Sequence, residues 1–259
     1  MRRPCRTSAG PCGKSRSLFV SHRCRNKRCY EARLLLALHK KQIARTLQCV
    51  TSEWLRETDS GAFRCWWPGD DDQYIAYHDT EWGRPVVDDQ RLFEKICLEG
   101  FQAGLSWLII LRKRENFRKS FEGFDMDTVA RYGEKDIERL VADAGIVRHR
   151  GKIEATINNA ARALELIQET GSLATFIWSF APQVPFGRDG EVSHASGIAT
   201  VSPSAIALSK ALKKRGWKFV GPTTMYSFMQ SMGLINDHLV QCHVHHDCEV
   251  ARIKVVKNL

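Results

Sequence analysis

The sequence lacks any apolar run that approaches the roughly 18 residues of a membrane-spanning helix, and we therefore expect a soluble protein with no membrane partner. Alternating polar and apolar residues, the pattern of a half-buried strand, are nearly absent as well. No internal repeat is present, which argues against solenoid and propeller architectures. What remains is a chain of 259 residues, 43% of them hydrophobic, which is long enough to bury a sizeable core.

Excess charge is missing from most of the chain. The formal net charge is +10, but residues 1–60 hold 14 Lys and Arg against 4 Asp and Glu, a difference of +10. Residues 61–259 therefore hold 25 of each sign. Any contact of this longer part with nucleic acid must depend on local basic patches, because its overall charge gives no attraction.

The sequence also lacks a secretory signal, and its number of cysteines is odd. The chain has nine cysteines, of which five lie in the first 60 residues. This pattern argues for a reducing compartment, such as the cytoplasm, and against a disulfide framework. Metal ligation is the more informative use of the four later residues, which are Cys65, Cys97, Cys242 and Cys248.

Residues 1–60 form a basic N-terminal extension. Residues 1–30 contain no acid and are rich in Arg, Ser and Cys, which predicts disorder, and a short amphipathic helix is predicted over 31–48. Three interpretations remain open: an organelle-targeting peptide, a basic arm that holds nucleic acid, or sequence upstream of a true start at Val50.

From Arg64 onward the composition becomes aromatic, and helix ends can be recognised. Capping residues, terminal glycines and one Pro at a first helical position predict helices over 88–100, from 125 through 129, and over 134–144, 151–168 and 202–216. Most turn signals fall within 181–201. The sequence therefore predicts an all-α fold.

Two pairs of possible metal ligands lie at the two ends of this helical part. Twelve residues separate Cys65 from His78, and three separate His238 from Cys242, so that the second pair can share one face of a helix or turn. Two thiolates and two imidazoles would complete a tetrahedral structural zinc site, one per chain. An incidental cluster remains the alternative. Other possible ligands nearby are His243, His245, His246 and Cys248.

The stretch Cys97–Trp107, CLEGFQAGLSW, contains one carboxylate and one indole in an otherwise apolar run. An acid beside an aromatic plane can bind a flat, nitrogen-rich ring, such as a nucleobase that has left the stack. The simpler interpretation is a core helix whose Glu99 points to solvent while Trp107 packs. Upstream, Trp66, Trp67, Tyr74, Tyr77 and Trp82 could form a stacking surface or be buried in the core.

The stretch KFVGPTTMYSFM follows a helix that ends at Gly216 and predicts a short turn centred on Gly221, with a new helix from Thr223 or Thr224. Such a helix–hairpin–helix exposes N–H groups and a positive dipole end to a phosphate. An ordinary turn with a solvated basic face is the alternative. The basic residues around it are Lys210, Lys213, Lys214, Arg215 and Lys218.

Six blocks, RCxW, YIAYHDTEWG, LEGFQAGLSW, GIVRHRGKI, SKALKKRGWKFVG and YSFMQSMGLINDH, together resemble the bacterial DNA-3-methyladenine glycosylase I family over about residues 64–248. The resemblance implies an all-α helix–hairpin–helix fold whose two ends are joined by zinc. It also implies base-excision repair, in which 3-methyladenine is removed hydrolytically from double-stranded alkylated DNA and an abasic site remains. We expect a glycosylase domain at 61–250, a short tail at 251–259 and a monomer, located in the cytoplasm and associated with the nucleoid through DNA.

Site residues follow from the resemblance at matching positions. The zinc ligands fall on Cys65, His78, His238 and Cys242. The base-recognising acid falls on Glu99, the stacking rings on Trp107 and Tyr77, and Trp67 and Tyr74 line the pocket. The DNA-binding candidates are Gly221, Thr223, Lys214 and Lys218. At Trp66 the sequence departs from the family, which has a small residue there, and this leaves the placing of Trp67 open.

The lesion itself suggests a mechanism. Methylation at N3 makes adenine cationic and a good leaving group, so no general acid is required. Glu99 would favour the positive charge, and Trp107 and Tyr77 would add a cation–π contribution of roughly 0.5–2 kcal/mol. No lysine lies within the pocket motifs to form a Schiff base, so strand cleavage is not expected. Asp237 could be a general base or could orient the zinc ligands.

Two other classes of function compete with the glycosylase. A non-catalytic DNA-damage-binding protein would have the same fold and bind lesions without turnover, although the presence of Glu99, Trp107 and Tyr77 argues against it. A zinc hydrolase would need an open metal position, which four protein ligands would already fill.

Overall fold

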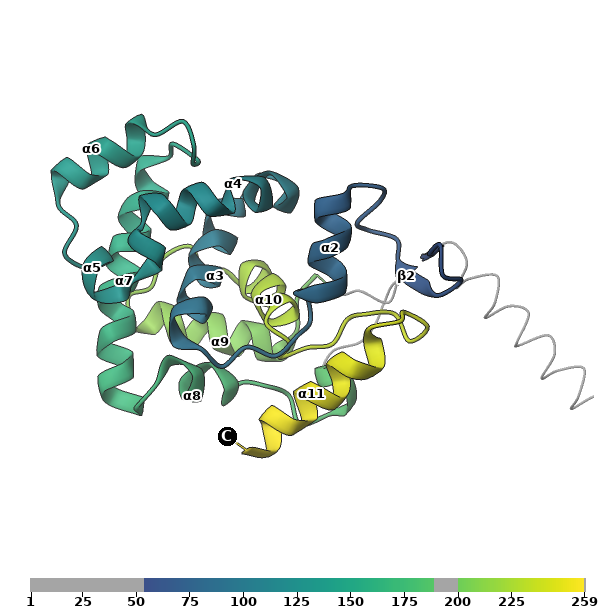
Figure 1. Cartoon of the computed structure of the whole chain (residues 1–259). Helices are drawn as coiled ribbons and strands as arrows, with labels where there is room; N and C mark the ends of the chain where they lie inside the picture. The colour runs from purple at the N-terminus through teal and green to yellow at the C-terminus, as the bar shows by residue number, and fades with distance from the viewer. Residues whose placement is uncertain (1–53, 189–199, 259) are drawn as a thin grey trace, which may run out of the picture. The chain divides into compact units, whose positions relative to one another are not determined.

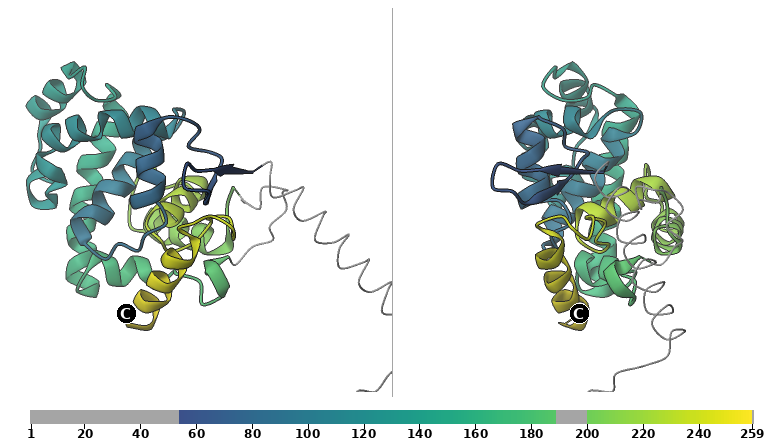
Figure 2. Two further views of the ribbon diagram at one scale, coloured as in Figure 1. Left: turned by 45° about the vertical axis from the view of Figure 1, so that its right-hand side comes forward. Right: turned by 90° about the vertical axis from the view of Figure 1, so that its right-hand side faces the viewer.

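The computed structural model describes residues 54–188 and 200–258 (Figures 1 and 2). The disorder predicted for residues 1–30, the helix predicted over 31–48 and the three interpretations of the N-terminal extension lie outside these residues. Part of the predicted loop over 181–201 also falls in the gap.

The described residues are mostly helical, and the predicted all-α class is confirmed in its main feature. Ten α-helices are present in them: α2 (Asp72–Thr80), α3 (Asp89–Gln102), α4 (Trp107–Ser120), α5 (Met126–Val129), α6 (Glu134–Ala142), α7 (Arg150–Thr170), α8 (Leu173–Trp178), α9 (Pro203–Lys214), α10 (Pro222–Ser231) and α11 (His245–Asn258). Two short 3-10 turns, Glu122–Phe124 and Pro185–Gly187, and two strands, β1 (Leu55–Glu57) and β2 (Phe63–Cys65), complete the described elements.

Side-chain caps begin several helices where the sequence predicts them. Asp88 accepts a hydrogen bond from the backbone N–H of Arg91 at the start of α3, with a distance of 2.8 Å. Asp125 and Ser202 cap α5 and α9 in the same way. These caps accept from N–H groups that have no partner within the helix, which is why the predicted helix starts are accurate.

A small antiparallel hairpin is the exception to the all-α prediction. Leu55 pairs with Cys65 and Glu57 with Phe63, and Phe63 forms an isolated bridge with Cys242. Strands of three residues are too short to show an alternating pattern, so the sequence gives no sign of them. The hairpin extends the folded part upstream of the predicted boundary at residue 61, and α11 continues through the predicted boundary at residue 250.

Helix α3 lies in the middle of the helical arrangement, as Figure 1 shows, and packs against α4, α7, α8 and α10. Its residues from Leu92 to Phe101 are all buried. A cluster of rings between α3, α4 and the following turn adds to this core, and each fully buried Phe contributes about 1.5–3 kcal/mol. The cluster consists of Phe93, Phe101, Phe117, Phe121 and Phe124. Glu99 therefore sits on a rigid, buried helix.

Helices α9 and α10 pack against each other and are joined by a short turn. The turn is held in place by Asn159 of α7, which donates to the carbonyl of Lys218 and accepts from its N–H, both at 2.9 Å. Ser209 also donates to the carbonyl of Val220 at 2.6 Å. Helix α10 begins at Pro222, slightly earlier than predicted, because Pro fits the first helical position, where no N–H partner is needed.

Among residues 54–188 and 200–258, no helix is long and apolar enough to cross a membrane.

Candidate base pocket and metal centre

A cavity of about 370 Å³ opens between α2, α3, the start of α4 and α10. The five residues predicted to bind or stack on a base all line it. Its full lining is Trp66, Trp67, Tyr74, Tyr77, Trp82, Glu99, Gln102, Trp107, Ser227 and Gln230. Segments far apart in the sequence thus meet at one concave, aromatic surface, which is the shape that a small planar ligand requires.

Glu99 lines this cavity and is only 4% exposed, so the alternative in which it points to solvent is wrong. Burial raises the pKa of its carboxyl group, and the nearby Lys95 opposes that shift. The predicted stretch Cys97–Trp107 is not one helix, because α3 ends at Gln102 and Trp107 begins α4. The turn between the two helices lets Glu99 and Trp107 face the same cavity.

Aromatic rings form the cavity walls. The ring centroids of Tyr77 and Trp107 are 5.6 Å apart, with a tilt of 40° between their planes. Trp67 meets Tyr74 edge-on at 4.9 Å. Trp66 packs edge-on against Trp54 at 4.5 Å, which explains how a large residue is accommodated next to Trp67. Burial raises the pKa of Tyr77 well above its ordinary value, so its hydroxyl stays neutral.

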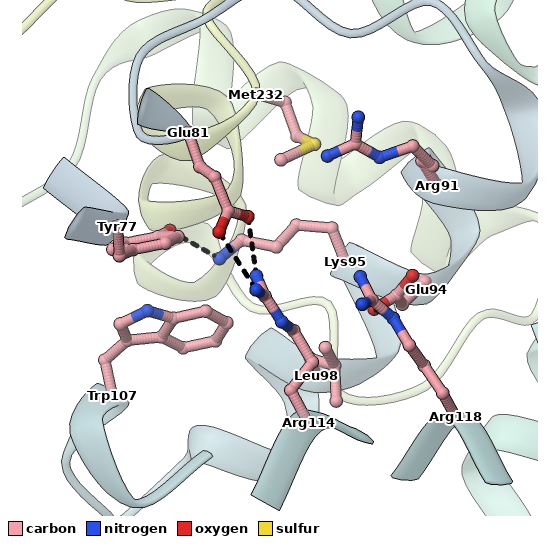
Figure 3. Close-up of a pocket in the computed structure, with 10 residues that line it drawn as sticks. All are labelled: Tyr77, Glu81, Arg91, Glu94, Lys95, Leu98, Trp107, Arg114, Arg118 and Met232. Atoms are coloured by element: carbon pink, nitrogen blue, oxygen red, sulfur yellow. Dashed lines mark hydrogen bonds and ion pairs between the residues drawn. The ribbon is translucent and has the colours of Figure 1, made fainter. Parts of the chain in front are cut away.

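Lys95 does not line this cavity, but it contacts three residues that do, and sequence reasoning missed it. It is 5% exposed, and its Nζ lies 2.9 Å from the Tyr77 hydroxyl (Figure 3). Nζ also lies 3.0 Å from Oε1 of Glu99. The same atom lies 3.2 Å from the centroid of the Trp107 ring. The available signal was its position four residues before Glu99 in a predicted helix, since such residues share a helix face.

The four predicted metal ligands meet in one buried cluster: Cys65, His78, His238 and Cys242. The Cys242 Sγ atom lies 3.7 Å from both His78 Nε2 and His238 Nδ1, and Cys65 Sγ lies 3.9 Å from His238 Nδ1. A tetrahedral zinc ion with ordinary Zn–S and Zn–N bonds separates its sulfur and nitrogen ligands by about 3.6 Å. The donor set therefore fits a closed zinc site.

Each imidazole of the cluster is oriented by its other ring nitrogen. Nδ1 of His78 lies 2.7 Å from the Asp79 carboxylate, and Nε2 of His238 lies 3.0 Å from the carbonyl of Trp82. These contacts direct the remaining nitrogens toward the two thiols, as a metal site requires. Burial lowers the pKa of His238, which keeps it neutral and able to ligate.

Asp79 is a second residue that the sequence analysis missed. Its carboxylate accepts hydrogen bonds from Arg64 and lies within bonding distance of His78 and His243. Burial opposes its ionisation, but the hydrogen bonds from these three partners hold its pKa well below the ordinary value. His243, considered above as a competing ligand, thus contacts the residue that supports the cluster.

Asp237 is 1% exposed and does not line the cavity. Its carboxylate accepts from the Tyr226 hydroxyl at 2.6 Å, Gln230 Nε2 at 2.7 Å and Arg188 Nε at 3.0 Å. Arg188 also donates to the backbone carbonyl of His238 at 2.9 Å. These contacts favour the interpretation in which Asp237 supports the region around the metal ligands over the one in which it is a general base.

The DNA-binding candidates lie at and around the turn between α9 and α10. Gly221 caps α10 without a side-chain hydrogen bond, and Thr223 is exposed in the first turn, where N–H groups have no partner within the helix. Lys214 and Lys218 are also exposed, whereas Arg215 pairs with Glu169 at 2.7 Å. Two exposed lysines thus lie in the sequence shortly before the N-terminus of α10.

Comparison with known proteins gives consistent matches. A family model described as methyladenine glycosylase matches residues 67–246. DNA-3-methyladenine glycosylase 1 of Escherichia coli (strain K12) is 54% identical over 179 residues, which cover 69% of this chain and 95% of the relative. A crystal structure of 3-methyladenine DNA glycosylase I has 52% identity and a TM-score of 0.66, over 70% of this chain and 99% of that one. A structure from Staphylococcus aureus, described as the basis of 3-methyladenine recognition by that enzyme, has 41% identity and a TM-score of 0.65, over 70% and 96%.

Proposed function

The chain belongs to the methyladenine glycosylase family, and on that premise we propose that it removes 3-methyladenine from alkylated DNA by hydrolysing the N-glycosidic bond. The reaction leaves an abasic site and belongs to base-excision repair. The observation that carries the assignment is the buried carboxylate of Glu99 in an aromatic cavity of about 370 Å³. That combination selects a planar cation over a neutral base.

In this proposal Glu99 accepts hydrogen bonds from the exocyclic amine side of the flipped base and stabilises its positive charge. Tyr77 and Trp107 stack on the base, and Trp67 and Tyr74 close the aromatic wall. The buried hydroxyl of Tyr77 stays protonated and holds no negative charge. Because 3-methyladenine already leaves as a neutral molecule, the protein needs to orient the nucleotide and admit water rather than to supply a proton.

We further propose that one structural zinc ion is held by Cys65, His78, His238 and Cys242. Four protein ligands leave no position for water, so the ion would stabilise the fold and take no part in bond cleavage. The support is the match of the sulfur–nitrogen distances to tetrahedral geometry and the orientation of both imidazoles. Such an ion would join the chain near β2 and α2 to the segment after α10.

Helices α9 and α10 would act as the helix–hairpin–helix that holds double-stranded DNA. Gly221 and Thr223 would present backbone N–H groups to a phosphate, and Lys214 and Lys218 would add local positive charge. Because each chain contains a complete pocket, a monomer is sufficient for activity. Cytoplasmic DNA would be the site of action.

The direct test measures release of methylated bases from alkylated duplex DNA by the full-length protein and by Glu99→Gln. The variant keeps the size of the side chain but loses its charge, and we expect a loss of about 100-fold or more, which corresponds to roughly 3 kcal/mol. Glu115→Gln is the matched control, because Glu115 is 70% exposed at its side chain and lies outside the cavity. Lesion binding without any release by the unmodified protein would instead identify a damage-binding protein.

A further inference from the structure

A buried ammonium group lies behind the wall of the proposed base pocket. Lys95 Nζ is 2.9 Å from the Tyr77 hydroxyl, 3.0 Å from Oε1 of Glu99 and 3.2 Å from the centroid of the Trp107 ring. These three partners line the cavity of about 370 Å³, whereas Lys95 does not. Figure 3 shows the separate cavity of about 30 Å³ that Lys95 lines together with Tyr77 and Trp107. The amine therefore contacts the residues proposed to bind the base and leaves the larger cavity open.

The Glu99 carboxylate needs a positive charge nearby to stay ionised. It is 4% exposed, and burial raises its pKa because the charged form loses its hydration. The groups that face it or share the cavity with it from neighbouring helices carry no charge at neutral pH: Tyr74 and Tyr77 of α2, Trp107 of α4 and Ser231 of α10. Lys95, one helical turn earlier on α3, supplies the charge that opposes the effect of burial.

Lys95 is itself mostly charged at neutral pH. Burial lowers its pKa to about 8, and Glu99 opposes this effect. Arg114 of α4 lowers the pKa further and Glu81 of α2 raises it, but these two residues pair with each other at 2.6 Å, so that their effects largely offset. Lys95 and Glu99 therefore form a buried ion pair at pH 7. Removal of one partner of such a pair leaves a charge that burial strongly disfavours.

Resting on the function proposed above, we propose that Lys95 is a positioning residue that keeps the Glu99 carboxylate ionised and fixed in the wall of the base pocket. It acts through Glu99 and does not touch the base. Its hydrogen bond to Tyr77 and its contact with the Trp107 ring hold both stacking residues at the same time. Without the ammonium group, Glu99 takes up a proton at neutral pH and loses its preference for a cationic base over a neutral one.

The test measures release of 3-methyladenine from methylated duplex DNA by the full-length protein between pH 5.5 and 9, with the enzyme-free rate subtracted at each pH. At pH 6, kcat/KM of Lys95→Met should be lower than that of the unmodified protein by about tenfold or more. At pH 9 the two should agree, because Glu99 is then ionised without help. Lys95→Arg keeps the charge, and the cavity of about 30 Å³ leaves room for its head group, so it should retain the unmodified pH profile.

Two controls separate the charge from other effects. Lys119→Met removes a lysine that is exposed on α4 and lines neither cavity, and it should leave the profile unchanged. In the Glu99→Gln background there is no carboxylate to keep ionised, so addition of Lys95→Met should cause no further loss that depends on pH. Infrared spectra of the proteins without DNA provide a readout besides turnover. The band of a protonated carboxyl group, assigned by its absence in Glu99→Gln, should be present at pH 6 in Lys95→Met and weaker in the unmodified protein.

A loss of release in Lys95→Met that is equal at every pH would show a merely structural role and overturn the proposal. An unchanged pH profile in Lys95→Met would overturn it too. If Lys95→Met fails to fold, Lys95→Gln takes its place, because it keeps a hydrogen-bond donor but has no charge. Absence of release by every protein at every pH rejects the glycosylase assignment, and the infrared spectra then still decide whether Lys95 keeps Glu99 ionised.

Discussion

Two consecutive residues of α2, Tyr77 and His78, belong to two different buried polar clusters. The clusters differ in how fully their polar groups are hydrogen-bonded. His78 enters the proposed metal centre, where both imidazoles and both thiols have partners. Tyr77 enters the base pocket, where Glu99 pairs with Lys95 and the indole nitrogens of Trp67 and Trp107 have no hydrogen-bond partner among the described residues. A closed cluster stabilises the fold, whereas an incompletely paired one retains capacity for a ligand.

The largest expected effect is on the closed cluster. Removal of the metal with a chelator should unfold the protein or lower its Tm greatly, because structural zinc contributes of the order of 10 kcal/mol in small zinc-binding domains. Cys242→Ser should have the same effect, measured by thermal unfolding and by metal content. His246→Gln is the control, since His246 is exposed and lies outside the four-residue cluster, and this variant should keep its zinc. If the chelator abolished activity but left the Tm unchanged, the ion would be catalytic, and the metal cluster could no longer be contrasted with the base pocket as purely structural.

The sequence predicts the closed cluster better than the open one. Cys65, His78, His238 and Cys242 are rare residue types with limited uses, so their identities indicate ligation before any geometry is known. Lys95 is an ordinary helical residue by sequence, and only the packing of α3 against α4 and the contact with Tyr77 of α2 show that it is buried beside Glu99. Asp79 was missed for a similar reason, because its role depends on partners from β2 and from the segment after α10.

The elements of the fold also differ in how well the sequence predicts them. Local capping signals are sufficient to place the starts of α3, α5 and α9, because a cap acts within a few residues of its helix. The hairpin of β1 and β2 depends on a bridge from Phe63 to Cys242, far away in the sequence, and no local pattern reports such a contact.

A smaller effect is expected in the open cluster. Trp107→Ala removes a stacking surface, which is worth about 1–3 kcal/mol per base, so release at low substrate concentration should fall roughly 5- to 150-fold. Zinc content should not change, since Trp107 lies outside the metal cluster. A loss of zinc in this variant would mean that the two clusters form one cooperative unit.

Asp237→Asn tests whether a third buried polar group, the Asp237 carboxylate, stabilises the fold, as the metal cluster does, or takes part in the reaction. The carboxylate accepts from Tyr226, Gln230 and Arg188, and loss of its charge should reduce the free energy of unfolding by about 1–3 kcal/mol. Turnover at a temperature where the variant remains folded should be close to that of the unmodified protein. A large fall in kcat with unchanged stability and zinc content would restore Asp237 as a general base.

The smallest effect is expected outside both clusters, at the exposed lysines beside α10. Lys214→Ala and Lys218→Ala should weaken binding to damaged and undamaged duplex DNA about equally, because a phosphate contact carries no information on the base. Each substitution should also reduce the slope of log affinity against log salt concentration by about 1. Lys135, exposed on α6 and remote in sequence from this turn, provides the control. If either lysine variant lost affinity only for the damaged site, the lysine would act on the flipped base, and discrimination would not be confined to the buried pocket.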